Sequence, residues 1–133
     1  MAASTPLLKQ ESMLGALDSR YVDVDDIPWK PTQCEGVQMK VLVEDSESGL
    51  LTALFKWEPG AVLPMHEHID LEQTFVLEGS IKDDEGEVTA GNYVWRPAGN
   101  RHYATAPNGA LVLSMFLKPN KFLEGEIAGQ ELK

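Results

Sequence analysis

The sequence predicts an all-β sandwich or small barrel, and three features carry this prediction. Apolar and β-branched runs recur from residue 37 onward. Turn segments rich in Gly, Pro and Asn separate these runs at intervals of roughly ten residues, as in all-β folds. The chain has 133 residues, of which 43% are hydrophobic, enough for one domain with its own core. The runs lie at residues 37–43, 50–57, 74–77, 93–95 and 111–117.

The first third of the chain has two interpretations. Thr5-Pro6 is typical of a helix start and Gly15 of a helix stop, which predicts a short helix. The alternative is a flexible or partner-dependent arm. Residues 21–27 alternate in an acidic pattern that indicates an edge strand, and Pro28 ends it. We therefore expect an N-terminal arm, short helix or edge strand at 1–26, a barrel at 27–122 and a C-terminal tail at 123–133.

Two of the predicted strands have little polar surface. In residues 50–57, one face carries Leu51, Ala53, Phe55 and Trp57, and Leu50 and Leu54 are among the residues on the other face. Residues 111–117 are apolar at nearly every position. A strand that is apolar on both faces needs cover on both. Because a small barrel covers only one face, the sequence predicts a homodimer.

Charge and composition exclude several classes of partner. The chain has 21 acidic and 11 basic residues and a net charge of -10. Nucleic acids and anionic membranes require clustered Lys and Arg, which the sequence lacks. It also shows no secretory signal and no apolar stretch of about 20 residues, the length that a membrane span needs. A single cysteine, Cys34, precludes an intramolecular disulfide. We expect a cytoplasmic protein.

All three histidines fall in two short segments that have metal-ligand spacing. His66 and His68 project from the same face of a strand because side chains alternate. Glu72 opens the next strand after a short turn, and His102 follows the Pro97-x-Gly99 turn. Imidazole and carboxylate are common ligands of divalent transition metals. The sequence therefore predicts one divalent metal ion per chain at these four residues.

These two segments resemble the paired cupin motifs, written G-x5-H-x-H-x3-E-x6-G and G-x5-P-x-G-x2-H-x3-N. Every defined position matches except the last, where Ala106 stands in place of Asn. The resemblance implies a double-stranded β-helix, or jelly-roll, barrel. It also implies His66, His68, Glu72 and His102 as metal ligands.

A narrower resemblance, over about residues 27 to 122, is to the ChrR-like cupins. It rests on segments that include Trp29-Lys30-Pro31, Phe75-Val76-Leu77-Glu78-Gly79 and Phe116-Leu117-Lys118-Pro119-Asn120. That family includes the zinc-binding domain of an anti-sigma factor, whose anti-sigma activity belongs to a separate helical zinc domain. The segment before residue 37 lacks the set of Cys and His ligands that such a zinc domain needs, so we do not expect anti-sigma activity. Related small cupins are dioxygenases that cleave β-diketones or aromatic hydroxyketones.

Other residues near the motifs are candidates for chemistry. Glu72, besides being a ligand, is a candidate general base. Arg96 is a candidate for binding a substrate enolate or carboxylate, with a surface ion pair as its alternative role. Tyr103 follows a ligand and is a third candidate catalytic residue. Glu67 lies between the two histidines and should face away from the metal. We expect Cys34 to be inert.

The function that these features predict is a metal-dependent small-molecule cupin, of the Fe(II) dioxygenase type, that acts on an enolisable ketone. One alternative is a zinc-binding sensor or binding module without catalysis. Another is a metal-dependent isomerase or lyase. Fe(II) and Zn(II) are the expected ions, with Mn(II) and Ni(II) as further alternatives.

Overall fold

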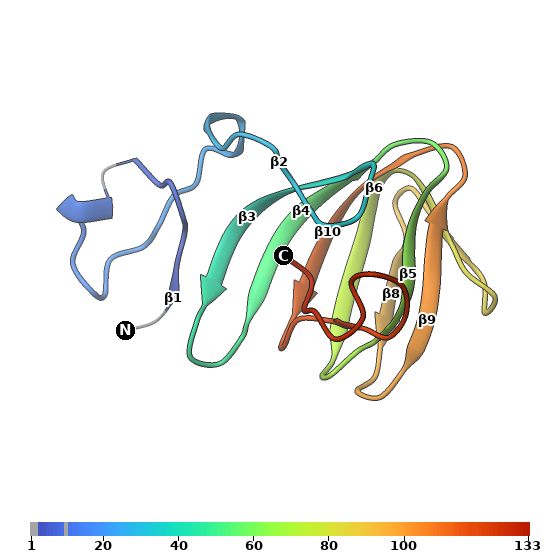
Figure 1. Cartoon of the computed structure of the whole chain (residues 1–133). Coiled ribbons are helices and arrows are strands. Elements are labelled where there is room, and N and C mark those ends of the chain that lie inside the picture. Colours follow the sequence, from blue (N-terminus) through green and yellow to red (C-terminus); the bar gives the residue numbers. More distant parts are fainter. Residues whose placement is uncertain (1–2, 10) are drawn as a thin grey trace.

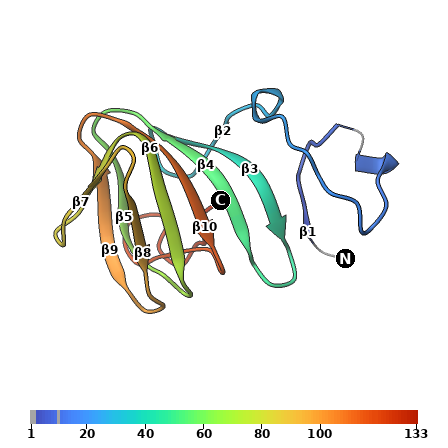
Figure 2. The ribbon, with the colours of Figure 1, turned by 180° about the vertical axis from the view of Figure 1, so that it is seen from behind.

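The computed structural model describes residues 3–9 and 11–133, and these form a curled antiparallel sheet that closes into a barrel (Figures 1 and 2). The predicted all-β class is confirmed. No helix in the described part of the chain is long and apolar enough to cross a membrane. The strands are β1 (Ala3–Ser4), β2 (Lys30–Pro31), β3 (Val37–Asp45), β4 (Leu51–Trp57), β5 (Ala61–Glu67), β6 (Glu72–Lys82), β7 (Glu87–Thr89), β8 (Tyr93–Arg96), β9 (Arg101–Ala106), β10 (Ala110–Phe116) and β11 (Lys121–Phe122).

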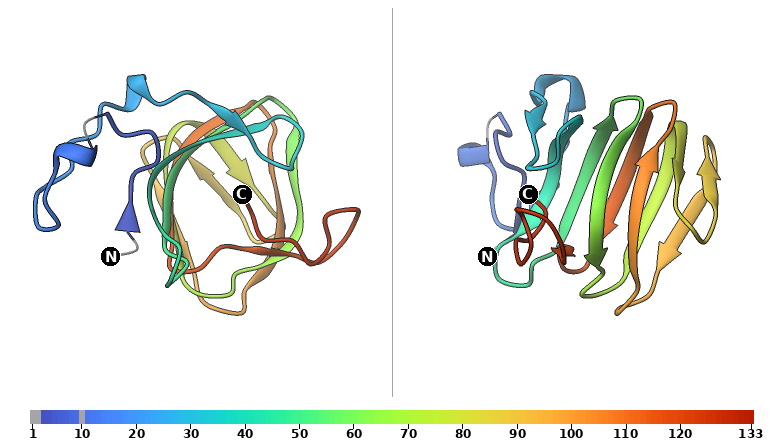
Figure 3. Two further views of the ribbon diagram at one scale, coloured as in Figure 1. Left: turned by 60° about the vertical axis from the view of Figure 1, so that its left-hand side comes forward. Right: turned by 45° about the vertical axis from the view of Figure 1, so that its right-hand side comes forward.

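The strand order follows the jelly-roll pattern that the cupin resemblance implies. The main path runs β1-β3-β4-β10-β6-β9-β5-β11, with β2 beside β3 and with β7 and β8 beside β6. Neighbours in this path that are far apart in sequence, such as β4 and β10, come together as the sheet curls around its core (Figure 3).

β6 belongs to both sides of the barrel. Its first part pairs with β10 and β8, and its last residues pair with β7 and β9. Gly79 lies between the two parts with a φ of 73°, a conformation that L-residues with a side chain rarely adopt. A Cβ atom at this position would collide with the carbonyl oxygen of Gly109. Only glycine fits at this close approach of β6 to the turn that contains Gly109.

The core lies inside the barrel and follows the alternation that the sequence predicts. Leu51, Ala53, Phe55 and Trp57 of β4 all point inward and are buried. β10 has the same alternation, with buried Ala110, Val112, Ser114 and Phe116 separated by half-buried apolar residues. Since both faces of β10 carry apolar side chains, its outer face remains partly uncovered in the single chain.

The N-terminal segment lies to one side of the barrel, beside the edge strand β3 (Figures 1 and 3). The predicted helix after Pro6 is not found among the described residues: Leu7 has a φ of 64°, and only a 3-10 turn, Glu11–Met13, follows. The predicted edge strand at residues 21–27 is wrong. That segment holds a second 3-10 turn, Val24–Asp26, because backbone groups bond locally: Asp26 N–H to Asp23 O, and Ile27 N–H to Val24 O.

Residues 123–133 turn back onto the barrel. Lys121 and Glu131 form a β-bridge, and the N–H of Leu132 donates to the carbonyl oxygen of Asn120. Leu132 is only 4% exposed. This segment is therefore part of the packed structure and contributes a side chain to the interior.

Candidate metal centre

The three histidines converge inside the barrel, as the sequence predicts. His66 near the end of β5 lies directly opposite His102 in the pairing of β5 with β9. His68 follows two residues later and returns to the same side. One ring nitrogen from each histidine lies within 4.8 Å of the others, and all three side chains are buried. Such a group can hold a metal ion.

Hydrogen bonds fix which nitrogen of two rings faces the centre. His66 Nδ1 lies 2.8 Å from the carbonyl oxygen of Pro64, and His102 Nδ1 lies 2.8 Å from Asp83 Oδ2. Both oxygens can only accept, so both Nδ1 atoms carry the proton. The Nε2 atoms of these rings are therefore left with free lone pairs. His68 Nε2 lies 2.9 Å from His102 Nε2.

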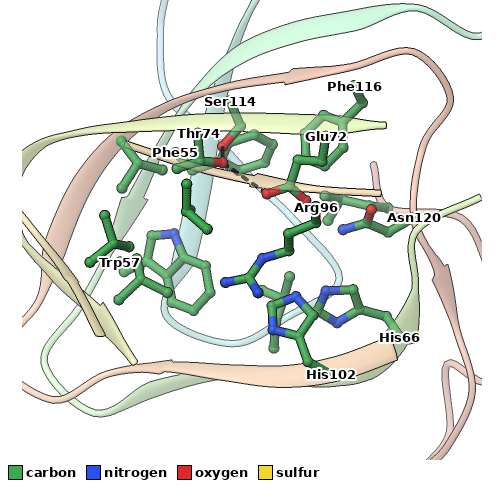
Figure 4. Close-up of a pocket in the computed structure, with 16 residues that line it drawn as sticks. Phe55, Trp57, His66, Glu72, Thr74, Arg96, His102, Ser114, Phe116 and Asn120 are labelled. Atoms are coloured by element: carbon green, nitrogen blue, oxygen red, sulfur yellow. Dashed lines mark hydrogen bonds between the residues drawn. The ribbon is translucent and has the colours of Figure 1, made fainter. Parts of the chain in front are cut away.

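Glu72, the first residue of β6, lies beside His68. Its Oε2 is 2.9 Å from His68 Nδ1, but this close contact does not have the alignment of a hydrogen bond. Its Oε1 accepts a hydrogen bond of 2.8 Å from Thr74, whose hydroxyl is 2.8 Å from that of Ser114 (Figure 4). Glu72 therefore lies beside the histidines, but it is not part of the group of mutually close ligand atoms, which comprises His66, His68 and His102.

Burial keeps the imidazoles of His66 and His102 neutral, and at His102 the nearby cation Arg96 adds to this effect. Burial, opposed in part by the hydrogen bond to Pro64, lowers the pKa of His66 to about 4. Burial and the positive charge of Arg96 lower the pKa of His102 to about 3. Burial alone would raise the pKa of Glu72, yet contacts with His68 and Thr74 hold it below its usual value. Neutral imidazoles beside a carboxylate are a donor set suited to a divalent cation.

Arg96 lies inside the barrel and not on its surface. It is 8% exposed, and its guanidinium nitrogen Nη2 lies 2.9 Å from Asp83 Oδ2. The guanidinium projects into the cavity beside His102 (Figure 4). The ion pair anticipated as the alternative role of Arg96 therefore exists, but it is buried at the site. Asp83, the partner of Arg96, was not predicted from the sequence.

His66 and His102 line one end of a narrow cavity in the barrel (Figure 4). The space open to the centre of a water molecule is about 40 Å³. Its walls are mainly apolar. Trp57 Nε1 and Asn120 Oδ1 are buried in this lining without a hydrogen-bond partner among the described residues. The apolar lining comprises Phe55, Trp57, Leu63, Ile81, Val88, Val94, Val112, Phe116 and Leu132.

Several other residues lie away from the cavity. Tyr103 is 41% exposed and is not part of the cavity lining, so its predicted catalytic role stays a prediction that its position does not support. Glu67 faces away from the histidines, as expected, and bonds to Arg101 at 2.7 Å. Cys34 is buried, and burial raises the pKa of its thiol to about 11. A thiol with so high a pKa is a poor nucleophile.

A jelly-roll barrel with inward-facing histidines from two neighbouring strands defines the class of protein as a cupin. The chain matches the model of the ChrR Cupin-like domain over residues 18–121. It belongs to this family, and the resemblance described from the sequence is confirmed. No curated protein matches the chain significantly.

Solved structures share the fold at low sequence identity. A proposed acetylacetone dioxygenase from Methylibium petroleiphilum PM1 is 23% identical, with 90% of each chain covered and a TM-score of 0.76. An acetylacetone dioxygenase from Acinetobacter johnsonii is 18% identical, with 90% of this chain and 87% of the other covered and a TM-score of 0.71. ChrR, in its complex with SigE from Rhodobacter sphaeroides, is 23% identical with a TM-score of 0.61. That match covers 70% of this chain and 51% of the other.

Proposed function

We propose that the three histidines hold one divalent metal ion, and the distance between His68 and His102 carries this proposal. His102 Nε2 has a free lone pair because Nδ1 donates to Asp83. The carboxylate of Glu72 beside His68 Nδ1 favours the proton on that nitrogen as well. Two lone pairs then face each other across 2.9 Å, which is unfavourable unless a cation lies between them. Shared coordination of a cation removes this repulsion.

The fourth predicted ligand, Glu72, has two roles compatible with its position. A small rotation would bring its carboxylate to an ion held by the histidines, because its present contact with His68 is not aligned as a hydrogen bond. In its present position it acts instead as a base next to the ion. The hydroxyls of Thr74 and Ser114 form a chain that leads from Glu72 along the cavity wall.

We further propose that the chain is a dioxygenase-type enzyme that acts on an enolisable ketone. A divalent ion at this site would supply Lewis acidity toward an enolate oxygen and, as Fe(II), electrons for the reduction of O₂. The Arg96 guanidinium favours an anionic form of the substrate in the cavity. Glu72 takes the proton next to the carbonyl group. The apolar walls around Phe55 and Trp57 exclude water.

Oxygen uptake tests this activity. Protein purified without an affinity tag is first analysed for bound metal, then stripped and reloaded with Fe(II). β-Diketones and hydroxyacetophenones are supplied, and an oxygen electrode follows consumption, with the same protein loaded with Zn(II) as the control. Substrate-dependent uptake with Fe(II) alone supports the proposal. Freshly isolated protein with stoichiometric zinc that Fe(II) does not displace would refute it.

The kinship with ChrR supports a second candidate, a zinc-binding module without catalysis. The same experiment separates the two, because a binding module consumes no O₂ with any metal. Product formation without O₂ would instead favour the third candidate, a metal-dependent isomerase or lyase. The predicted cytoplasmic location stays an expectation from the sequence.

We also propose that the chain forms a homodimer through the outer face of β10, β6 and β8. Leu113 of β10 pairs with Phe75 of β6, which pairs with Tyr93 of β8, so these side chains form one row across three strands. Phe75 is 38% exposed and Trp95, two residues beyond Tyr93, is 55% exposed. A contiguous apolar surface of this kind is typical of an interaction site.

A further inference from the structure

Asp83 lies in the turn after β6 with its carboxylate held in place by the backbone. Its Oδ1 accepts hydrogen bonds from the N–H groups of Glu85, at 2.8 Å, and Gly86, at 2.9 Å. Its own N–H donates to the carbonyl oxygen of Gly86. The side chain is only 2% exposed. These bonds orient Oδ2, which takes no part in the turn itself.

Oδ2 is shared by two buried partners. His102 Nδ1 lies 2.8 Å away and the Arg96 guanidinium 2.9 Å away. The guanidinium compensates the carboxylate charge, so that Asp83 is stable as an ionised group in the barrel interior. An ionised carboxylate only accepts hydrogen bonds, so it requires the proton of His102 to lie on Nδ1.

The other two histidines lack an equivalent partner. His66 donates to a backbone carbonyl, that of Pro64, and His68 Nδ1 has no aligned hydrogen bond. Among the three rings, only His102 is thus oriented by a charged side chain through an aligned bond. A carboxylate behind an imidazole both fixes its tautomer and makes its other nitrogen a stronger ligand.

We propose that Asp83 is the positioning residue of this site: it fixes His102 as the Nδ1–H tautomer, directing the Nε2 lone pair toward the ion. Arg96 stabilises the charged form of Asp83 and so acts on the His102 ring indirectly, through Asp83. The effect on metal affinity rests on the proposed metal site, whereas the effect on the tautomer concerns the protein without metal.

Two variants test the proposal. In Asp83→Asn the carbonyl group retains the turn bonds to Glu85 and Gly86, but the amide can only donate to His102 Nδ1. The proton of His102 is then expected on Nε2. Glu85→Gln is the matched control, because Glu85 Oε1 lies 3.9 Å from Arg96 and does not contact His102. Thermal unfolding verifies that both variants fold, and Asp83→Ser, a smaller hydroxyl side chain, replaces Asp83→Asn if that variant does not.

The first measurement is the ¹⁵N chemical shift of the His102 ring nitrogens in the metal-free proteins. The second is Zn(II) affinity, measured by competition with a chelator. We expect a Nδ1–H tautomer in the unmodified protein and in Glu85→Gln, and its loss in Asp83→Asn. We also expect Zn(II) binding to weaken about 10- to 100-fold in Asp83→Asn, the usual effect of removing such a partner.

A retained Nδ1–H tautomer in Asp83→Asn overturns the proposal, even if affinity falls, because a loss of charge alone would then explain the weaker binding. A Zn(II) affinity within twofold of the unmodified protein, with a shifted tautomer, also overturns the role in metal binding. If the unmodified protein binds neither Zn(II) nor Fe(II), the metal site itself fails. The tautomer measurement still decides whether Asp83 positions the ring.

Discussion

His68 Nε2 and His102 Nε2 lie 2.9 Å apart, the distance of a hydrogen bond, although neither histidine is arranged to supply the proton. His102 carries its proton on Nδ1, toward Asp83, and Glu72 attracts the proton of His68 to the opposite side of that ring. The two nitrogens are therefore placed for a cation that both contact. The first two predictions follow from this relationship.

Removing a histidine should remove the metal but not the fold. In His66→Ala we expect bound metal to fall from one ion per chain to almost none, because a ligand from the buried group is lost. The far-ultraviolet circular dichroism should remain that of a β-protein, because the core residues do not depend on the ion. Added metal should raise the unfolding free energy of the unmodified protein by about 3 kcal/mol at 100 times Kd and leave the variant unchanged. Full metal occupancy in the double variant His66→Ala/His68→Ala would contradict the site.

Glu72→Gln separates the two roles of Glu72. If the carboxylate is a base, the variant keeps its metal and loses turnover; if it is a ligand, the variant loses metal. Elemental analysis and oxygen uptake on the same sample distinguish these results. Glu67→Gln is the control, because Glu67 faces away from the site and pairs with Arg101. A variant with unchanged metal and unchanged turnover would exclude both roles.

Acid should destabilise the metal-free protein well above the pH at which ordinary carboxylates titrate. The pKa values of His66 and His102 are about 4 and about 3 in the folded chain, whereas an unfolded histidine titrates near pH 6.5. Between these values the unfolded chain binds more protons, so the unfolding free energy falls as the pH falls. The slope is at most about 1.4 kcal/mol per pH unit for each histidine.

Urea unfolding at several pH values between about 7.5 and 4.5 measures this slope, since the effect begins near the unfolded histidine pKa. His66→Gln, which cannot titrate, should show a shallower dependence on pH. A midpoint that does not change over this range would contradict the assignment of neutral, buried imidazoles.

Gly79→Ala should be far more destabilising than Gly60→Ala. Both glycines have positive φ values, 73° and 83°, so each substitution costs about 1 kcal/mol of backbone strain. At Gly79 the new Cβ would also meet the Gly109 carbonyl oxygen, whereas nothing lies within 4 Å at Gly60. We expect Gly79→Ala to lose at least about 3 kcal/mol more of unfolding free energy. Equal losses, measured by urea unfolding, would contradict the close approach of Gly79 to the Gly109 backbone.

Light scattering tests the proposed dimer. The unmodified chain should have about twice the monomer mass of 14.7 kDa. Phe75→Glu places a charge in the apolar row across β10, β6 and β8 and should yield a monomer. Val62→Glu is the matched control, because Val62 is similarly exposed, at 48%, on a strand outside this row. A monomeric unmodified protein at micromolar concentration would contradict the dimer.

The sequence predicted the parts of the molecule that depend on local alternation. His66, His68 and Glu72 lie within seven residues, so the short turn between β5 and β6 is enough to place them together. Asp83 could not be found in this way, because its bond to His102 joins residues 19 positions apart through the closure of a turn onto another strand. Nothing local distinguishes Asp83 from its neighbour Asp84.

The sequence also does not predict which side chains of β8 face the interior of the barrel. Hydrophobicity favours Tyr93 and Trp95 as the inward-facing residues of this strand. The structure has the opposite alternation: Tyr93 and Trp95 are 47% and 55% exposed, while Arg96 is buried. The partner that stabilises the inward Arg96 is Asp83, which again depends on tertiary contacts. The strand predicted for residues 21–27 was wrong for a related reason, because a short-range turn forms where the alternation of the sequence indicated a strand.

β6 pairs with strands on both sides of the barrel, and this position affects how the molecule unfolds. Its first residues, with Glu72, pair with β10 and β8, and its last residues pair with β7 and β9 just before Asp83. Neither half of the barrel can open without breaking bonds to this strand. The amide protons of β6 should therefore exchange with solvent only in global unfolding, so that the barrel behaves as one cooperative unit.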